Sequence, residues 1–198
     1  ADLSHLRLLI SGHDLSRAPS DSHQSVKQQD GGWIVDVHPP TLKNSPGVTI
    51  SEAGASLSRW TQPSLNIPSS SPRFVQLSKK IVGDRKRVRE ASLAIRNYVH
   101  TIMHPNAGIG VVRNADEVLT TKEGVCRDYA ILTTTLLRAA GIPARVASGL
   151  EAFRGRFYYH AWSEAWDGKR WIGIDSTVPE EQISAGHVKL ACGSVEDA

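Results

Sequence analysis

Three side chains in the second half of the sequence could together carry out acyl transfer through a thiol: Cys126, His160 and Asp175. Cys126 lies in the first turn of a predicted helix, where the partial positive charge of the helix N-terminus stabilises a thiolate. This position makes Cys126 a candidate nucleophile. The alternative is a small core residue, because cysteine is among the most frequently buried residue types.

His160 and Asp175 lie on two strand-like runs that Asp167 and Gly168 separate, and an Asp-Gly pair between strands is a strong signal for a two-residue hairpin loop. In that register His160 is directly opposite Asp175. Opposed side chains share a face of the sheet, with Cβ atoms about 4.5–5.5 Å apart. The carboxylate would then accept a hydrogen bond from the imidazole. The alternatives are a surface charge pair and a core histidine.

The three groups supply the nucleophile, the base and the residue that orients the base. In this hypothesis the Cys126 thiolate attacks a carboxamide or peptide carbonyl, His160 protonates the leaving amine, and a thioester remains on the enzyme. Trp162 is two residues from His160 and therefore lies on the same strand face. We expect it to be a candidate substrate-binding residue.

Four sequence blocks within about residues 115–180 resemble the transglutaminase-like superfamily and follow one another in that family's order: 124–130 (GVCRDYA), 137–146 (LRAAGIPARV), 160–164 (HAWSE) and 171–177 (WIGIDST). Residues 177–190 further resemble the tail of the bacterial members. The resemblance implies an α+β, papain-like fold, in which the helix that carries the nucleophile packs on an antiparallel sheet. It also implies a nucleophile at Cys126, a base at His160 and an orienting carboxylate at Asp175.

An oxyanion hole needs a second donor beside the backbone N–H of the nucleophile. Papain-type enzymes place a glutamine six residues before the cysteine, where this chain has Thr120. Tyr98 and Asn114 are the other candidates. The resemblance implies no cofactor, and the sequence contains no calcium loop of the EF-hand type.

Water or an amine could resolve the thioester. An amine-dependent transferase needs an amine site and a thioester shielded from water. Animal transglutaminases use an upstream tryptophan, and no tryptophan lies between Pro72 and Cys126. We therefore expect hydrolysis, by a cysteine peptidase or amidase acting on a peptide or protein. The alternatives are a protein-glutamine gamma-glutamyltransferase and a non-catalytic module that binds peptides.

Three parts of the chain are expected to position these residues. Residues 1–60 read as a β-rich N-terminal segment, with one strand expected at 48–50, and residues 61–72 as a solvated linker with three prolines and four serines. Residues 73–198 are the expected catalytic domain. It should contain two amphipathic helices, the helix of Cys126, and three strands near residues 144–151, 157–166 and 169–175.

The composition excludes several other classes of protein. With 198 residues, 40% of them hydrophobic and 22% charged, the chain has the length and composition of one ordinary globular domain, or of one domain with a small second domain. The longest apolar run has four residues, whereas a membrane helix needs about 20. Two cysteines allow at most one disulfide, and the Cys pair does not have the spacing of a structural zinc site.

The net charge of +3 includes a basic cluster at residues 79–89, but no aromatic residues interleave with it, so we expect a solvated helix face and no nucleic-acid partner. The chain begins without methionine, and we expect it to be part of a larger multidomain protein. The sequence leaves its cellular compartment open.

Overall fold

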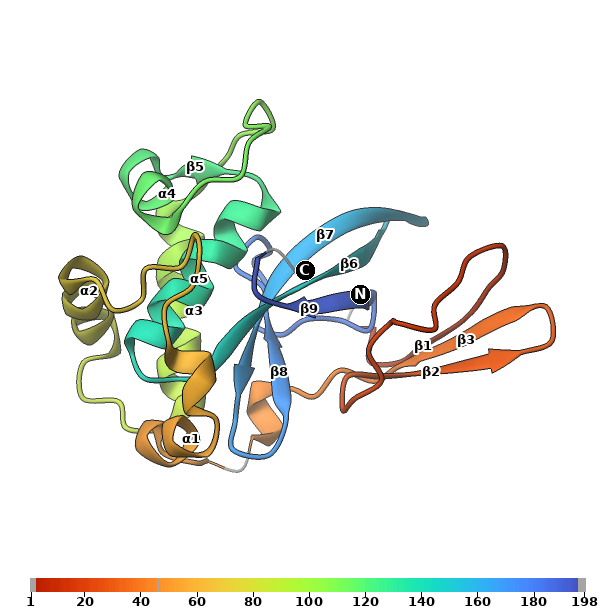
Figure 1. The fold of residues 1–198 in the computed structure, drawn as a ribbon, viewed down its shortest axis with the longest axis horizontal. Coiled ribbons are helices and arrows are strands. Elements are labelled where there is room, and N and C mark those ends of the chain that lie inside the picture. The colour runs from red at the N-terminus through yellow and green to blue at the C-terminus, as the bar shows by residue number, and fades with distance from the viewer. Residues whose placement is uncertain (1–2, 46, 196–198) are drawn as a thin grey trace.

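A computed structural model of the chain describes residues 3–45 and 47–195 (Figure 1). Helices cover one side of a four-stranded antiparallel sheet with strand order β8-β7-β6-β9, and a three-stranded antiparallel sheet, order β1-β3-β2, projects on the other side. The strands of these sheets are β1 (Leu6–Ile10), β2 (Gln24–Gln29), β3 (Gly32–Val37), β6 (Ala144–Phe153), β7 (Arg156–Trp166), β8 (Trp171–Ile174) and β9 (His187–Gly193).

Five α-helices and two short 3-10 helices are described: η1 (Leu42–Asn44), α1 (Ile50–Ser56), η2 (Ser58–Thr61), α2 (Pro72–Val82), α3 (Val88–Ile102), α4 (Ala115–Thr121) and α5 (Cys126–Ala139). Two short parallel strands, β4 (His104–Pro105) and β5 (Glu123–Gly124), join the end of α3 to the start of α5. The α+β fold with a nucleophile helix on an antiparallel sheet is confirmed. None of the described helices is both long enough and apolar enough to cross a membrane.

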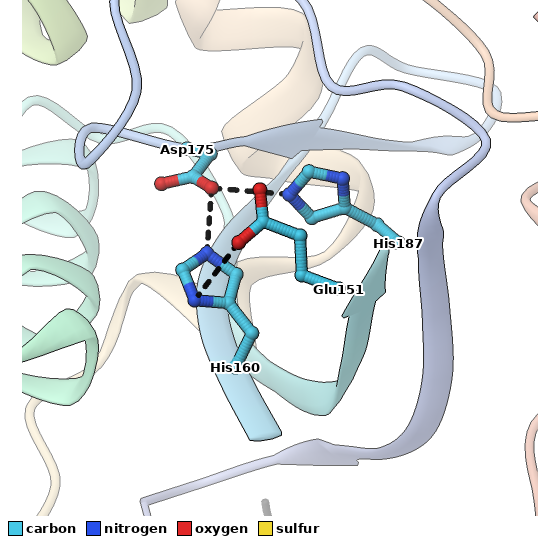
Figure 2. Close-up of side chains that lie close together, drawn as sticks. All are labelled: Glu151, His160, Asp175 and His187. Atoms are coloured by element: carbon cyan, nitrogen blue, oxygen red, sulfur yellow. Dashed lines mark hydrogen bonds and ion pairs between the residues drawn. The ribbon is translucent and has the colours of Figure 1, made fainter. Parts of the chain in front are cut away.

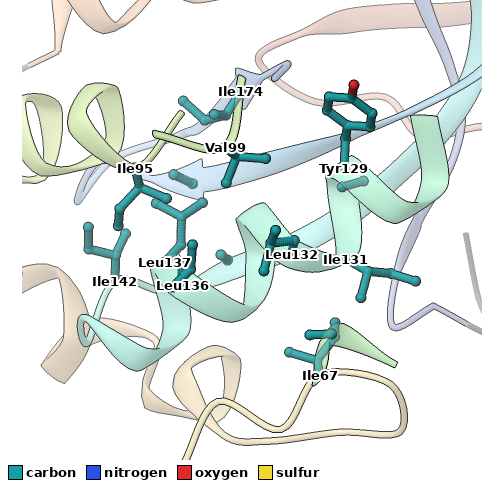
Figure 3. Close-up of a cluster of buried hydrophobic side chains, with 14 of the residues drawn as sticks. Ile67, Ile95, Val99, Tyr129, Ile131, Leu132, Leu136, Leu137, Ile142 and Ile174 are labelled. Atoms are coloured by element: carbon teal, nitrogen blue, oxygen red, sulfur yellow. The ribbon is translucent and has the colours of Figure 1, made fainter. Parts of the chain in front are cut away.

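Helix α5 is buried along almost its whole length, because it contacts α2, α3 and α4 as well as β7. Figure 3 shows side chains of this helix, among them Leu132 and Leu136, within the buried hydrophobic cluster. The side chains of Leu132 and Leu136 are fully buried. The helix also buries three consecutive threonines, 133–135, whose hydroxyls all form hydrogen bonds. These bonds matter because a buried hydroxyl without a partner is costly.

Helices α2 and α3 agree with the predicted amphipathic pattern. Pro72 occupies the first turn of α2, and the buried faces include Phe74 in α2 and Ile95 and Val99 in α3. The basic residues between Lys79 and Arg89 are exposed. The predicted exposure of these residues is therefore observed, but Arg85, Lys86 and Arg87 lie in the connection between α2 and α3 and not on a helix face.

Two local predictions for the N-terminal third are wrong. The strand expected at 48–50 is absent, because Thr49 caps helix α1: its side chain accepts a hydrogen bond from the Glu52 N–H, and Glu52 accepts one from the Thr49 N–H. The Pro/Ser-rich segment 61–72 is not uniformly solvated, because it places Ile67 in the core. One apolar side chain is enough to anchor a segment whose composition otherwise favours solvent.

The hairpin register also differs from the expected one. Trp166 pairs with Trp171, so the loop has four residues, 167–170, and the pairing has moved by two positions. The cause is the buried Asp167 carboxylate, which accepts hydrogen bonds from the N–H groups of Lys169 and Arg170. Because side chains alternate with a period of two, a shift of two residues leaves every side chain on the same face.

The three-stranded sheet is tied to the rest of the chain by a buried ionic network. The Lys189 ammonium lies 2.6 Å from carboxylate oxygens of both Asp21 and Glu164. Near it, the His23 ring bonds to the backbone oxygen of His187 at 2.6 Å. Residues before β2 therefore contact the same strand, β9, that begins at His187.

Candidate active site

The N-terminus of α5 is built by contacts between Gly124, Asp128 and Arg113. The buried Asp128 carboxylate accepts a hydrogen bond from the Val125 N–H at 2.9 Å and pairs with the Arg113 guanidinium at 3.3 Å. A Cβ atom at Gly124 would lie 2.5 Å from the Asp128 Cβ, so only glycine fits there. These contacts set where α5 begins and place Cys126 in its first turn.

The Cys126 thiol interacts with the ring of His160. Burial by itself would raise the pKa of this thiol, but a hydrogen bond with His160 and its positive charge lower that pKa below its usual value. The backbone N–H groups of Ala161 and Arg127 act in the same direction. The environment of Cys126 therefore favours a thiolate.

Cys192 differs from Cys126 in this respect. Both cysteines are free thiols and both are partly buried. Burial raises the pKa of Cys192, and no hydrogen bond to its sulfur offsets that effect. The two thiols are therefore expected to react at different rates.

His160 and Asp175 are hydrogen-bonded, with Nε2 of the ring 2.7 Å from Oδ2 of the carboxylate (Figure 2). The expected contact is present although its register basis was wrong: β8 ends at Ile174, and Asp175 reaches His160 from just beyond the paired residues. Burial disfavours the imidazolium, but Asp175, Cys126 and Glu151 together raise the pKa of His160 to about 10.

The Asp175 carboxylate is buried, and each of its two oxygens has two hydrogen-bond partners. Burial raises its pKa, but hydrogen bonds from His160 and His187 hold that pKa well below the usual range. Oδ2 faces Nε2 of both His160 and His187, the latter at 3.1 Å. Oδ1 accepts hydrogen bonds from the N–H of Thr177 at 2.8 Å and from its hydroxyl at 2.7 Å. The carboxylate therefore has one defined orientation.

The segment after Asp175 is held by α3 and α5. Arg96, a buried residue of α3, donates hydrogen bonds to the backbone oxygens of Asp175 at 3.0 Å and Glu180 at 2.8 Å, and to that of Val178. The Thr133 hydroxyl in α5 lies 2.8 Å from the hydroxyl of Ser176. Two helices thus fix the backbone that carries the carboxylate.

His187 and Glu151 complete the group and were not singled out in the sequence as site residues. The Glu151 carboxylate lies 3.6 Å from Nδ1 of His160, and His187 is the first residue of β9, which pairs with β6 at Glu151 (Figure 2). The sequence did contain a signal for His187, since the block 185–190 resembles the tail of bacterial family members. Only the folded chain brings that block to Asp175.

Glu151, His160, Asp175 and His187 each offer a potential metal-ligand atom, and these atoms lie within 4.8 Å of one another. Short contacts of 2.7 and 3.1 Å already join Asp175 to the two rings. Oδ2 of Asp175 is therefore already in contact with two ring nitrogens.

Trp162, the candidate for substrate binding, is 1% exposed. Its ring lies behind the site, with centroids 6.2 Å from the His160 ring and 5.2 Å from the His187 ring. The other tryptophans of the second half, Trp166 and Trp171, pack against each other with centroids 5.4 Å apart. Packing is therefore the observed role of that pair.

The three candidates for a second oxyanion donor make contacts with other parts of the chain. The Thr120 hydroxyl bonds to the backbone oxygen of Asp116, and the Asn114 side chain caps α4 by accepting the Glu117 N–H. Tyr98 is partly buried and packs against the core cluster. In the part of the chain that the structure describes, none of the three forms a hydrogen bond with Cys126 or His160.

A family model described as the transglutaminase-like superfamily matches residues 75–176, just over half of the 198 residues. The chain belongs to the transglutaminase-like superfamily. The match includes the nucleophile helix and the β7–β8 hairpin, and it ends one residue after Asp175. It begins inside α2, so the three-stranded sheet of this superfamily member lies outside the shared region.

Two relatives of this superfamily member are much longer than the matched region. A protein-glutamine gamma-glutamyltransferase of Pseudomonas aeruginosa is 32% identical over 112 residues, which are 50% of this chain and 16% of that protein. An uncharacterized protein of Mycobacterium leprae is 31% identical over 140 residues, covering 63% of this chain and 48% of its own length. The chain thus matches less than half of the length of either relative.

Solved structures have the same fold. A candidate cysteine protease from Cytophaga hutchinsonii superposes with a TM-score of 0.71 over 97% of this chain and 77% of its own, at 22% identity. The periplasmic domain of TgpA from Pseudomonas aeruginosa superposes with a TM-score of 0.58 over 87% of this chain and 69% of its own, at 20% identity. At these identities the likeness shows the fold alone.

Proposed function

We propose that this chain is an enzyme that performs thiol-dependent acyl transfer on peptide or glutamine carboxamide bonds, with Cys126 as the nucleophile. The observation that carries the proposal is the 2.7 Å hydrogen bond between His160 and the buried carboxylate of Asp175, beside a thiol, Cys126, whose pKa His160 lowers. Nucleophile, base and orienting group in this order are what acyl transfer through a thiol needs.

The reaction starts from a thiolate and an imidazolium, because the pKa of Cys126 is lowered and that of His160 is raised to about 10. The thiolate attacks the carbonyl carbon, and the imidazolium then gives its proton to the leaving amine or ammonia as the C–N bond breaks. A thioester to Cys126 remains. Asp175 stays ionised throughout and stabilises the imidazolium, in keeping with its lowered pKa.

Residues behind the base maintain its orientation. His187 shares Oδ2 of Asp175 with His160, and the buried Trp162 packs against both rings. We therefore propose that His187 and Trp162 are positioning residues. Trp162 would affect the reaction of the substrate only through His160, since its own ring has almost no exposed surface.

We propose water as the acceptor of the acyl group, so that the enzyme is a cysteine peptidase or amidase. Transfer to an amine requires that the thioester be shielded from water, which is present at about 55 M. Trp162 lies behind the base, and Trp60 packs against Trp171 with centroids 5.9 Å apart. These placements favour an unshielded thioester.

Protein-glutamine gamma-glutamyl transfer is the second candidate. It is favoured by one observation, the name of the Pseudomonas aeruginosa relative that is 32% identical over 112 residues. The Cys126 thioester is common to both reactions, so the two differ only in the nucleophile that resolves it.

One experiment separates the candidates. The chain is incubated with a glutamine-containing protein and a labelled primary amine, while ammonia, new amino termini and incorporated label are measured. Cleavage or ammonia release without label is expected, and Cys126→Ala should abolish it. Label incorporation that is lost in Cys126→Ala, without cleavage, would replace hydrolysis by transfer.

A peptide-binding module without catalysis is the remaining alternative. It predicts that Cys126→Ala binds peptide as the natural chain does and that neither protein produces ammonia, new termini or labelled product. We also propose that residues 73–198 form the catalytic domain and that residues 1–60 form an N-terminal segment, which residues 61–72 join to that domain and which packs against it through Ala53. Expression of residues 73–198 with full activity would support that division.

A further inference from the structure

Three potential metal ligands converge on the projecting three-stranded sheet, away from Cys126. They are His5, which immediately precedes β1, Asp36 near the end of β3, and His38, which immediately follows β3. Each offers one ligand atom, and the three atoms lie within 4.8 Å of one another. We propose that this cluster is a binding site for a divalent transition-metal ion such as Zn²⁺.

The pairing of β1 with β3 creates the cluster. Leu6 pairs with Val37 and Arg7 with Asp36, so the same register continued by one residue places His5 opposite His38. Asp36 and His38 are two residues apart and therefore share one face of the strand. Alternation along β3 and pairing across to β1 bring all three side chains to one face of the sheet.

The distances suit a shared ion. Nε2 of His5 lies 2.9 Å from Oδ1 of Asp36, and Nε2 of His38 lies 3.3 Å from the same oxygen. Zinc binds imidazole nitrogen and carboxylate oxygen at about 2.0–2.2 Å, so neighbouring ligands around one ion are about 3–3.5 Å apart. The two rings are stacked, with centroids 3.9 Å apart and planes 10° from parallel, so their nitrogen lone pairs run nearly parallel, and rotation of one ring about its side-chain bonds would turn both toward one ion.

The backbone on both sides of the cluster is already held in place. The N–H of His38 donates a hydrogen bond to the backbone oxygen of His23, and Pro39 restricts His38 to an extended conformation. Just before His5, the backbone oxygen of Leu3 accepts a hydrogen bond from Ala185. An ion would therefore bind to residues whose backbone needs little rearrangement, which lowers the entropic cost of binding.

The charge and exposure of the cluster also favour an ion. The side chains of His5 and His38 are 48% and 63% exposed to solvent, so further coordination positions are open to water or to another ligand. Two neutral imidazoles and one carboxylate are a donor set that suits Zn²⁺ and its neighbours in the transition series. The Arg7 guanidinium, 4.0 Å from Oδ2 of Asp36, contacts the oxygen that the histidines leave free.

Calorimetric titration of the full chain with Zn²⁺ tests the proposal. Because thiols and the His160 cluster also attract Zn²⁺, the titration uses a chain that carries Cys126→Ala, Cys192→Ala and His187→Ala. One Zn²⁺ should bind to this chain. Its affinity should fall at least tenfold when His5→Ala or Asp36→Asn is added, and it should not change with His13→Ala, an exposed histidine of the same segment.

Thermal unfolding provides a second measurement on the same chains. His5 precedes the first strand, so His5→Ala should fold normally in the presence of a chelator. Zn²⁺ should raise the Tm of the parent chain and of His13→Ala, but not that of His5→Ala. The proposal is overturned if the parent chain binds no Zn²⁺, or if His5→Ala and Asp36→Asn bind it as tightly as the parent does.

Discussion

Asp175 and His187 lie 3.1 Å apart at Oδ2 and Nε2, although one follows the edge strand β8 and the other begins β9 at the opposite edge of the sheet. This contact gives the carboxylate a second histidine partner besides the base. A carboxylate with several hydrogen bonds has little freedom to rotate, so the base that it orients is also restrained.

The role of this contact can be tested with His187→Gln. Loss of the ring removes one hydrogen bond to Asp175 and loosens His160, and a displacement of about 1 Å near the reacting groups lowers rates by up to a hundredfold. We expect kcat/KM to fall by about tenfold to a hundredfold. An equal effect of His13→Gln, far from the site, would show that the loss is not specific.

The thiols should differ in reactivity. The pKa of Cys126 is lowered by His160 in spite of burial, whereas burial raises that of Cys192. At pH 6–7, iodoacetamide should therefore alkylate Cys126 faster, as measured by mass spectrometry of the two peptides, and His160→Ala should remove the difference. Equal rates in the natural chain would contradict an activated nucleophile.

The pH dependence of activity should change in Asp175→Asn. Asp175 contributes to the raised pKa of His160, about 10, so its replacement by a neutral amide should move the alkaline limb of kcat/KM to lower pH. We also expect activity to fall by roughly a thousandfold or more, as the ring loses its orientation. An unchanged alkaline limb would mean that another group controls it.

The free energy of unfolding should also depend on the protonation of His160. Because the pKa of His160 is higher in the folded chain than in the unfolded chain, its contribution is fully present below about pH 6.5 and is lost as the pH rises toward about 10. The difference in free energy of unfolding between the natural chain and His160→Gln should therefore shrink over that range. Chemical denaturation at several pH values measures it, and a difference that grows with pH would contradict the prediction.

Gly124→Ala should disturb the start of the nucleophile helix. The added Cβ would lie 2.5 Å from the Asp128 Cβ, and we expect a loss of about 1–3 kcal/mol in stability together with slower alkylation of Cys126. Gly110→Ala is the matched control, because nothing lies within 4 Å of a Cβ at that position. Both variants are compared by chemical denaturation, and equal stabilities would refute the packing argument.

Much of the site follows from local sequence. The cysteine at a helix start, the His and Asp on neighbouring strands, and the apolar faces of residues 72–102 could all be predicted, because each depends on short-range periodicity or turn chemistry. Even the wrong hairpin register kept His160 and Asp175 on one face. A shift of two residues preserves the alternation of side chains. The sequence therefore determined which face of the sheet each side chain occupies, although it did not determine the length of the loop.

Only the tertiary structure decided the contacts between distant segments. The contact of His187 with Asp175, the hydrogen bonds from Arg96 to residues 175–180, and the burial of Ile67 depend on how helices and strands pack, which no local pattern encodes. The four-residue loop itself depends on the burial of Asp167, whose carboxylate takes backbone N–H groups as partners. A buried charged group must find such partners, and their identity becomes known only when the chain is folded.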